Sequence, residues 1–312
     1  MIYLPGSGNT GNSLGGQRIL VLIERKGHYG LIVPYAWRIL MSLFTIDSEK
    51  CLCCGLCAAE CPAGCILYEP DQSPVPHEKK YAYCIECGHC MAVCPSGAFQ
   101  LTRFDVAGLP ADRSLKLSGP QVEQFLKMRR SVRAFRNEPV GRDVLERLLD
   151  LTQYAPSGHN ARAVRWGVAA TPEKVQGIAE ATVGWMRGEV EADSEMAAKL
   201  HLAGIVRAWD GGTDLVCRHA PALAVAHGVS RGVTPIEDGV IGVTYLELAV
   251  AGAGLGACWC GYVHMAANLD DEVRRLLGIP EGNKAFGALM LGKAVRRFSS
   301  IPPRPKADVN WL

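Results

Sequence analysis

The feature that most constrains this chain is a cysteine pattern that occurs twice within residues 51–95. Each copy reads C-x-x-C-x-x-C-x-x-x-C-P, and the second copy follows the first at an offset of 33 residues, from Cys51 to Cys84. Three thiolates two residues apart can hold three corners of one [4Fe–4S] cubane, whereas the fourth lies further along the chain and ligates the other cubane. The pattern therefore predicts a fold built around two [4Fe–4S] clusters.

The crossed arrangement assigns four ligands to each cluster. The expected sets are Cys51, Cys54, Cys57 and Cys94 for one cluster, and Cys84, Cys87, Cys90 and Cys61 for the other. Structural zinc is the alternative, because paired C-x-x-C motifs also form tetrahedral zinc sites. Zinc sites do not require eight cysteines in two copies of this motif, nor a proline after each fourth cysteine. The sequence therefore favours [4Fe–4S] clusters over zinc. Cys53 and Cys65 are extra and are expected to pack near a cluster, while Gly55 and Gly88 leave space beside the sulfides.

The distribution of the cysteines argues against disulfides. Ten of the 13 cysteines fall between Cys51 and Cys94, and no signal peptide is recognised, so we expect metal ligation in a cytoplasmic protein. No apolar stretch is long enough to span a bilayer, and a net charge of +2 gives no indication of nucleic acid or a membrane as partner. Residues 41–105 carry eight acidic and four basic side chains, which suits docking to a basic protein surface.

Composition divides the chain into four parts. Residues 42–105 form the predicted cluster domain, residues 106–119 a linker rich in glycine, proline and polar residues, and residues 120–312 a larger domain. Residues 1–41 are expected to be an N-terminal extension, native or not. Within it, residues 6–11 resemble the flavodoxin phosphate loop, but about 40 residues are too few for a doubly wound flavin domain.

Beyond the linker, hydrophobic periodicity predicts alternating helices and strands. Helices are expected at residues 121–130, 142–154, 172–190, 194–209, 237–253 and 270–277. Strands are expected at residues 164–169, 222–227, 257–263 and 285–292. Thr171 is expected to cap the helix that begins at Pro172. This order of elements indicates an α+β or α/β domain.

The larger domain contains three motifs and one further basic residue that are candidates for a binding site. The first is an arginine-rich motif. Its guanidinium groups can present forked donors to a phosphate dianion. A turn and a glycine-rich stretch follow, and one arginine lies near the C-terminus. The residues concerned are Arg129, Arg130, Ser131 and Arg133, then Pro156, Ser157, Gly158 and Asn160, then Trp259, Cys260 and Gly261, and finally Arg304.

In order and spacing, these motifs resemble the nitroreductase-like FMN flavoproteins over residues 121–312, and the cysteine module resembles the bacterial two-cluster ferredoxins. The resemblance implies an α+β fold in which helices surround a central mixed sheet, with FMN and two [4Fe–4S] clusters as cofactors. It implies that the residues named above, Arg130 among them, are flavin-binding candidates, and that Arg129, Ser131 and Arg133, together with Arg304, contact the phosphate or the ribityl chain. The turn at residues 156–160 would touch the isoalloxazine ring, with residues 259–261 beside the flavin. Family members are homodimers whose flavin lies at the shared interface.

Three details of this region need interpretation. Arg162 and Ala163 stand where the family often has Gln-Pro, which leaves the ring-edge contact and the substrate preference open. Residues 252–257 match a degenerate dinucleotide fingerprint, but they follow a helix and precede a strand, which is the reverse of a Rossmann loop. Their glycines are expected to end the helix. Cys260 is either a reactive thiol or, more commonly at such a place, a buried neutral one.

Iron–sulfur clusters pass one electron at a time, whereas a flavin can accept single electrons and deliver two. A chain that joins a cluster domain to a flavin domain is therefore expected to convert one-electron transfer into two-electron reduction. We expect an FMN-dependent oxidoreductase that reduces a nitro, quinone, enone or similar electron-poor organic acceptor, with reduced ferredoxin or NAD(P)H as donor. The alternative is an electron-transfer component that serves a protein partner and has no small-molecule substrate. No catalytic residue is identified; the candidate proton donors are His159, His219, Tyr262 and His264.

Overall fold

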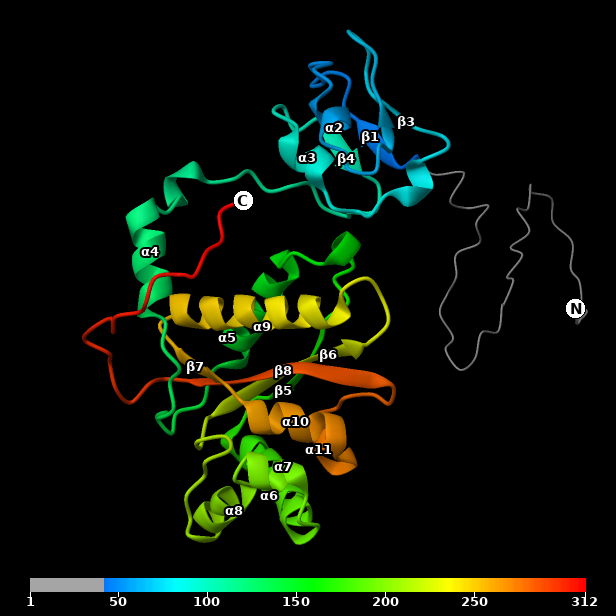
Figure 1. Cartoon of the computed structure of the whole chain (residues 1–312). Coiled ribbons are helices and arrows are strands. Elements are labelled where there is room, and N and C mark those ends of the chain that lie inside the picture. Colours follow the sequence, from blue (N-terminus) through cyan, green and yellow to red (C-terminus); the bar gives the residue numbers. More distant parts are fainter. Residues whose placement is uncertain (1–41) are drawn as a thin grey trace, which may run out of the picture. The chain divides into compact units, whose positions relative to one another are not determined.

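The computed structural model describes residues 42–312 (Figure 1). The predicted extension at residues 1–41, with its glycine-rich segment, lies outside the described residues. The chain divides into two compact units between Pro110 and Ala111. Within residues 42–312, no helix is long and apolar enough to cross a membrane.

The smaller unit contains two short antiparallel strand pairs and two short helices. Its elements are β1 (Phe44–Ile46) paired with β4 (Phe99–Leu101), β2 (Ile66–Leu67) paired with β3 (Val75–Pro76), α2 (Leu56–Ala59), the 3-10 helix η1 (Tyr81–Tyr83) and α3 (His89–Val93). The rings of Phe44 and Phe99 face each other with centroids 4.4 Å apart, and Ile66 and Leu101 complete a small core with them. This core holds the two cysteine-bearing helices in place.

The larger unit is organised around a four-stranded sheet. Its strands are β5 (Arg165–Ala169), β6 (Ala222–Val229), β7 (Gly256–Trp259) and β8 (Asn283–Gly292), in the order β5-β6-β8-β7. All three strand pairs are antiparallel. A parallel backbone bridge joins Ser131 to Ala257, where the Val132 N–H donates to the Ala257 carbonyl at 2.8 Å. This bridge brings the arginine-rich motif to the free edge of β7.

Helices cover both faces of this sheet, as Figure 1 shows. The first face carries α5 (Arg142–Leu151) and α9 (Pro235–Gly252); the second carries α6 (Pro172–Glu191), α8 (Leu202–Asp210), α10 (Gly261–Leu269) and α11 (Asp271–Leu276). Successive side chains of β6 alternate between the faces, since Ala224 packs with α9, and Leu223 and Val225 pack on the opposite side. Both faces are therefore buried, which explains why β6 is apolar along most of its length.

Helix ends follow local capping rules. α4 (Gly119–Met128) begins with a capping box, in which Ser118 and Gln121 exchange side-chain and backbone hydrogen bonds. The predicted cap of α6 is confirmed, because the Thr171 hydroxyl accepts from the Lys174 N–H at 3.4 Å. The remaining short elements are η2 (Arg113–Leu115), η3 (Thr152–Tyr154), η4 (Gly158–Asn160) and α7 (Glu195–Lys199).

The α+β fold class is confirmed, and two element predictions need correction. The helix predicted over residues 194–209 is two helices, α7 and α8, because His201 adopts a left-handed φ of 54° between them. The strand predicted over residues 257–263 ends at Trp259, and α10 follows. Burial of Val263, Ala266 and Ala267 shows the helical spacing that distinguishes α10 from a strand.

Candidate cluster and flavin sites

The internal repeat of the cysteine sequence is also present in the backbone. Three pairs of equivalent positions have positive φ angles: Cys53 and Glu86, Gly55 and Gly88, and Gly64 and Gly97. The middle pair forms the N-caps of α2 and α3, with φ of 69° and 73°. A Cβ at Gly55 would also lie 2.5 Å from the Tyr68 ring. These two glycines, predicted to leave space beside a cluster, thus also meet a conformational need of each cysteine loop.

One cavity of the smaller unit is lined by the four cysteines of the first predicted ligand set. They are Cys51, Cys54, Cys57 and Cys94. The cavity holds about 340 Å³, its opening included, and its wall contains Ile46, Leu52 and Phe99. Since Cys57 lies in α2 and Cys94 directly follows α3, the lining thiols come from both copies of the repeat.

A second cavity is lined by the other predicted set. Its lining contains Cys61, Cys84, Cys87 and Cys90, together with the extra cysteine Cys65. The cavity holds about 360 Å³, its opening included, with Leu43, Ile66 and Leu101 in its wall. Burial raises the pKa of the Cys90 thiol to about 12. Binding of iron at this thiol must therefore displace a proton.

These two cavities fit cubane clusters better than zinc ions. Each lining contains the four thiols of one predicted set among mostly apolar residues, and four thiolates are the ligand set of a [4Fe–4S] cluster. Thiols spread around a cavity suit the corners of a cubane, whereas tetrahedral zinc needs four ligands about 2.3 Å from one centre.

The two extra cysteines lie close to these ligand sets. Cys65 is 1% exposed and lines the second cavity, but its thiol donates to the Lys80 carbonyl at 3.2 Å and its N–H donates to the Cys61 sulfur at 3.2 Å. The Cys53 carbonyl accepts from the Tyr68 hydroxyl at 2.7 Å. Both residues therefore help to fix the cysteine loops through their own hydrogen bonds.

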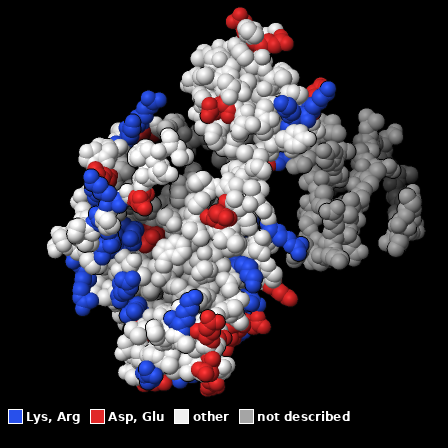
Figure 2. Space-filling model, viewed as in Figure 1, with Lys and Arg blue, Asp and Glu red and all other residues white. Residues whose placement is uncertain are grey.

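A wide, basic cavity lies in the larger unit. It holds about 990 Å³, its opening included, and is lined by Arg129, Arg130, Ser131, Val132, Arg133, Ala134, Arg296, Phe298 and Arg304. Four of the lining residues are predicted phosphate or flavin contacts from the arginine-rich motif, and Arg304 comes from the C-terminal segment. Figure 2 shows Lys and Arg side chains gathered over α4 and this segment. Five guanidinium groups around one cavity suit a phosphate dianion.

Two of these arginines have defined partners. Arg129 directly follows α4, and its Nη1 donates to Oε1 of Glu247 in α9 at 2.9 Å. The other carboxylate oxygen of Glu247 accepts from the Trp259 indole N–H at 3.3 Å. The Arg130 guanidinium lies over the Phe298 ring, 5.8 Å from its centroid. The chain thus orients two of the five cavity arginines through its own side chains.

The turn predicted to touch the flavin ring lies elsewhere in this chain. Pro156 and Ser157 line a separate small cavity with Asp238 and Gly242 near the start of α9. The Gly158 N–H donates to the buried Asp238 carboxylate at 2.9 Å, and His159 and Asn160 adopt positive φ angles. The structure therefore does not bring this turn into the arginine cavity of the same chain.

The third motif follows the edge strand β7. The pKa of the Cys258 thiol is raised by burial, although the nearby Arg133 and Ser131 side chains oppose that shift. Trp259 reaches Glu247, as described above, whereas Gly261 is exposed at the start of α10. Cys260 is 2% exposed, and its thiol donates to the Val216 carbonyl at 3.2 Å. Cys260 is therefore a buried thiol with a backbone partner.

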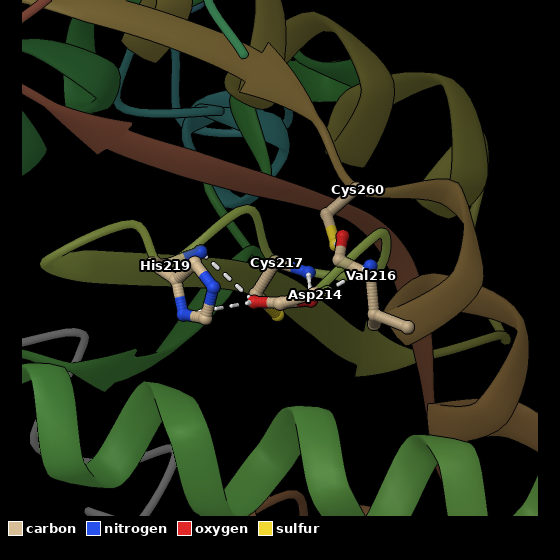
Figure 3. Close-up of polar contacts among 5 residues, drawn as sticks. All are labelled: Asp214, Val216, Cys217, His219 and Cys260. Atoms are coloured by element: carbon tan, nitrogen blue, oxygen red, sulfur yellow. Dashed lines mark hydrogen bonds and ion pairs between the residues drawn. The ribbon is translucent and has the colours of Figure 1, made fainter. Parts of the chain in front are cut away.

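A second polar cluster, centred on Asp214, lies beside Cys260 (Figure 3). The buried Asp214 carboxylate accepts from the backbone N–H groups of Val216, Cys217 and His219, each at 2.8 Å. A hydrogen bond with the Cys260 thiol, together with burial and the Asp214 charge, raises the pKa of Cys217 well above its usual range. A protonated, fully buried thiol is not a nucleophile, so this Asp, Cys and His combination is structural.

The candidate proton donors differ in their surroundings. His264 Nε2 lies 3.1 Å from the Ala285 carbonyl, and Tyr262 is half-buried against the core. His219 is mostly exposed, with Nδ1 4.0 Å from Asp214, and His159 is exposed on the turn before β5. None of these four side chains lines the arginine cavity.

Sequence reasoning missed three residues that the structure places at or beside this cavity: Glu247, Arg296 and Phe298. The sequence could have indicated a buried ion pair at Glu247, because this acidic residue lies on an otherwise apolar helix face and a buried carboxylate needs a partner. Arg296 and Phe298 lie in a segment without regular structure, so no periodicity marked them.

Models of known protein families match both parts of the chain. The model of the Nitroreductase family matches residues 126–293, and that of a 4Fe-4S binding domain matches residues 78–100, which contain the second cysteine motif. The FMN reductase (NAD(P)H) of Bacillus subtilis (strain 168) is 25% identical over 192 residues, 61% of this chain and 72% of that protein.

Among solved structures, a nitroreductase with bound FMN from Bacteroides fragilis NCTC 9343 is 24% identical, with a TM-score of 0.51 over 62% of this chain and 97% of its own. A nitroreductase with bound FMN from Desulfitobacterium hafniense DCB-2 is 23% identical, with a TM-score of 0.49 over 61% of this chain and 97% of its own. The first likeness shows the shared fold, and the family match covers more than half of the chain. The chain is therefore an oxidoreductase that belongs to the Nitroreductase family, with a 4Fe-4S binding domain ahead of the family domain.

Proposed function

We propose that this chain is an FMN-dependent oxidoreductase that takes electrons through two [4Fe–4S] clusters and reduces an electron-poor organic acceptor, such as a nitro compound, quinone or enone. The observation that carries the proposal is that one chain contains three cavities, each lined by residues suited to one of the proposed cofactors. Two cavities each contain the four cysteines of one predicted ligand set in their linings, and the lining of a third contains five arginines. When bound, the clusters pass single electrons and the flavin exchanges them in ones or pairs.

The linings of the two cavities suggest one cluster in each. We propose that the set with Cys51 holds one cluster and the set with Cys84 holds the other, each with its crossed fourth ligand, Cys94 or Cys61. The apolar walls limit the access of water to the bound thiolates, and burial and solvent exposure are among the factors that set cluster potentials. The proposed domain limits are residues 42–105 and 120–312, with the linker at residues 106–119.

In the larger domain, we propose that the arginine cavity holds the phosphate end of FMN. Arg133 and Arg304 have no carboxylate partner among the described ion pairs, so their guanidinium groups are free to bind a dianion. Residues 259–261 and the turn at residues 156–160 are the proposed contacts of the ring, and both regions present backbone groups. FMN rather than another flavin is supported by the nitroreductases of the same fold that were solved with bound FMN.

A second copy of this chain is proposed to complete the flavin site. α9 is apolar around its circumference, yet Ile236, Val240 and Tyr245 on it are exposed, and such a helix is normally buried on all sides. The arginine cavity lies near the end of α9 and the turn at residues 156–160 near its start. A two-fold partner that covers α9 would bring the turn of one copy to the cavity of the other.

The donor is proposed to be NAD(P)H or a reduced ferredoxin. The name of the Bacillus subtilis relative supports NAD(P)H, whereas the cluster module supports a one-electron carrier. None of the 13 cysteines forms a disulfide in the structure, which suits a reducing compartment such as the cytoplasm.

The test is anaerobic and starts with the purified protein, reduced in turn by NAD(P)H and by reduced ferredoxin. The reduced protein is then mixed with nitroarenes, quinones and enones while the flavin absorbance is followed. Rapid, saturable reoxidation by one class of compound is expected, and it names the reaction type. Reoxidation by oxidised ferredoxin and by none of these compounds would instead identify an electron-transfer component that serves a protein partner.

A further inference from the structure

The carboxylate of Glu247 is the main buried charge beside the arginine cavity. Its side chain is 9% exposed, and its two oxygens have different partners: Arg129 Nη1 at 2.9 Å and the Trp259 indole N–H at 3.3 Å. Among the ion pairs of residues 42–312, this is the one that involves an arginine of the cavity lining. The other four lining arginines have no such partner in the described part of the chain.

Because the Glu247 carboxylate is buried, its ion pair with Arg129 differs from a pair on the protein surface. A carboxylate inside the helix layer loses its water and needs a cation and hydrogen bonds in compensation. Arg129 supplies the cation, yet its side chain is still 33% exposed and lines the cavity. One nitrogen of its planar fork is engaged by Glu247, and the remaining donors are available to an anion in the cavity.

We propose that Glu247 is a positioning residue that fixes the Arg129 guanidinium in the orientation that binds the flavin phosphate. The indole N–H of Trp259 holds one oxygen of Glu247, so the other oxygen is directed at Arg129. Glu247 acts through Arg129 and does not touch the flavin phosphate itself. The inference rests on the proposed function, since it takes FMN as the ligand of the cavity.

The test uses the full chain with its clusters, freed of flavin and titrated with FMN and with riboflavin. Riboflavin lacks the phosphate, so the ratio of the two dissociation constants reports the phosphate contact alone. For Glu247→Gln we expect FMN binding to weaken by about tenfold, the loss of one charge-assisted contact, with riboflavin binding unchanged. Glu180→Gln, at an exposed glutamate of α6 on the other face of the sheet, is the matched control and should leave both constants unchanged.

A double variant separates positioning from general damage. Arg129→Gln should weaken FMN binding by at least as much as Glu247→Gln, and the double variant should bind FMN no more weakly than Arg129→Gln alone. Additive losses would show that Glu247 acts independently of Arg129. An equal loss of FMN and riboflavin binding in Glu247→Gln would show a structural role only. Either result overturns the inference.

A third variant covers the case in which Glu247→Gln fails to fold. Arg129→Lys keeps a cation for Glu247 but lacks the fork that serves two partners at once. It should fold and lose the preference for FMN over riboflavin; retention of the full preference overturns the inference. Failure of the wild-type chain to bind any flavin would instead contradict the proposed function, so the two failures are distinguishable.

Discussion

The backbone N–H of Gly158 donates to the Asp238 carboxylate at 2.9 Å, and this bond ties the turn at residues 156–160 to the first turns of α9. Nine residues further along the same helix, Glu247 holds Arg129. With a rise of 1.5 Å per residue, the two anchors lie roughly 14 Å apart along the axis. One helix thus fixes both expected flavin-contact segments at positions that do not share one cavity.

This separation predicts that each flavin site is shared by two copies. We expect a mixed dimer, with Arg133→Glu in one copy and Asp238→Ala in the other, to bind about one flavin per dimer, because one of its two sites combines an intact cavity with an intact turn. The measurement is flavin content after tandem affinity purification of differently tagged copies. The two single-variant homodimers serve as controls and should bind little flavin. No flavin in the mixed dimer would show that each site lies within one chain.

The two cysteine cavities predict independent losses of iron. The wild-type chain should contain about eight iron atoms, and Cys87→Ser should retain about four, because the cavity with Cys51 keeps all its thiols. Cys54→Ser should likewise retain about four from the other cavity. Iron analysis and low-temperature EPR of the reduced protein measure both losses.

The control for these iron losses is Cys53→Ser, which changes a thiol outside both cavity linings and should keep the wild-type iron content. The same iron content in Cys87→Ser as in the wild type would contradict the ligand assignment.

The cysteine sets and the arginine motif could be grouped from the sequence because both groupings depend on chemistry at fixed spacing, and the structure brings the members of each group to a shared cavity. A cubane requires its thiolates at set positions, so the two cysteine motifs that begin at Cys51 and Cys84 can be recognised before the fold is known. The arginine motif is similarly local, and the structure places Arg129, Ser131 and Arg133 in one cavity with Arg304, 171 residues beyond Arg133.

Other features depended on tertiary contacts that no local pattern specifies. The apolar run that starts at Tyr262 suits a strand or a helix, and packing against the sheet selects α10. The break at His201 requires a left-handed residue that local propensity disfavours. Glu247 gains its role only where α9 crosses the arginine motif. The turn at residues 156–160 was predicted as a ring contact, but only the fold shows that it and the arginine cavity lie at different ends of α9.

The buried His227 of β6 predicts a loss of stability on mild acidification. Burial, with the positive charge of Arg165 as a second cause, lowers the pKa of His227, and its Nδ1 lies 3.0 Å from the Asn283 amide nitrogen. The unfolded chain takes up this proton near its ordinary pKa of about 6.5, before the folded chain does. Stability is therefore complete above that pH and falls as the pH drops towards the folded pKa, by up to about 1.4 kcal/mol per pH unit.

Thermal unfolding between pH 7 and pH 5.5, monitored by circular dichroism, measures this dependence. His227→Gln, which removes the titrating group but keeps an acceptor for Asn283, should show a flatter profile over the same range. An unchanged slope in this variant would assign the pH dependence to other groups.

Gly167 of β5 tests the packing of the sheet against the second helical layer. A Cβ at Gly167 would lie 2.2 Å from the backbone oxygen of Leu277, and since backbone cannot rotate away as a side chain can, the strand or the end of α11 must shift. We expect Gly167→Ala to destabilise the larger unit by about 3 kcal/mol or more, at the upper end of overpacking costs. The melting temperature of the variant measures this loss.

Gly177, inside α6, is the matched control for this substitution. A Cβ at Gly177 would meet no heavy atom within 4 Å outside its own helix turn. Gly177→Ala should therefore stabilise the unit by about 0.5–1 kcal/mol, because alanine favours the helical backbone. The melting temperatures of the two variants should move in opposite directions, since the same added methyl group is blocked at one position and accommodated at the other. Equal melting temperatures would contradict this account of the packing.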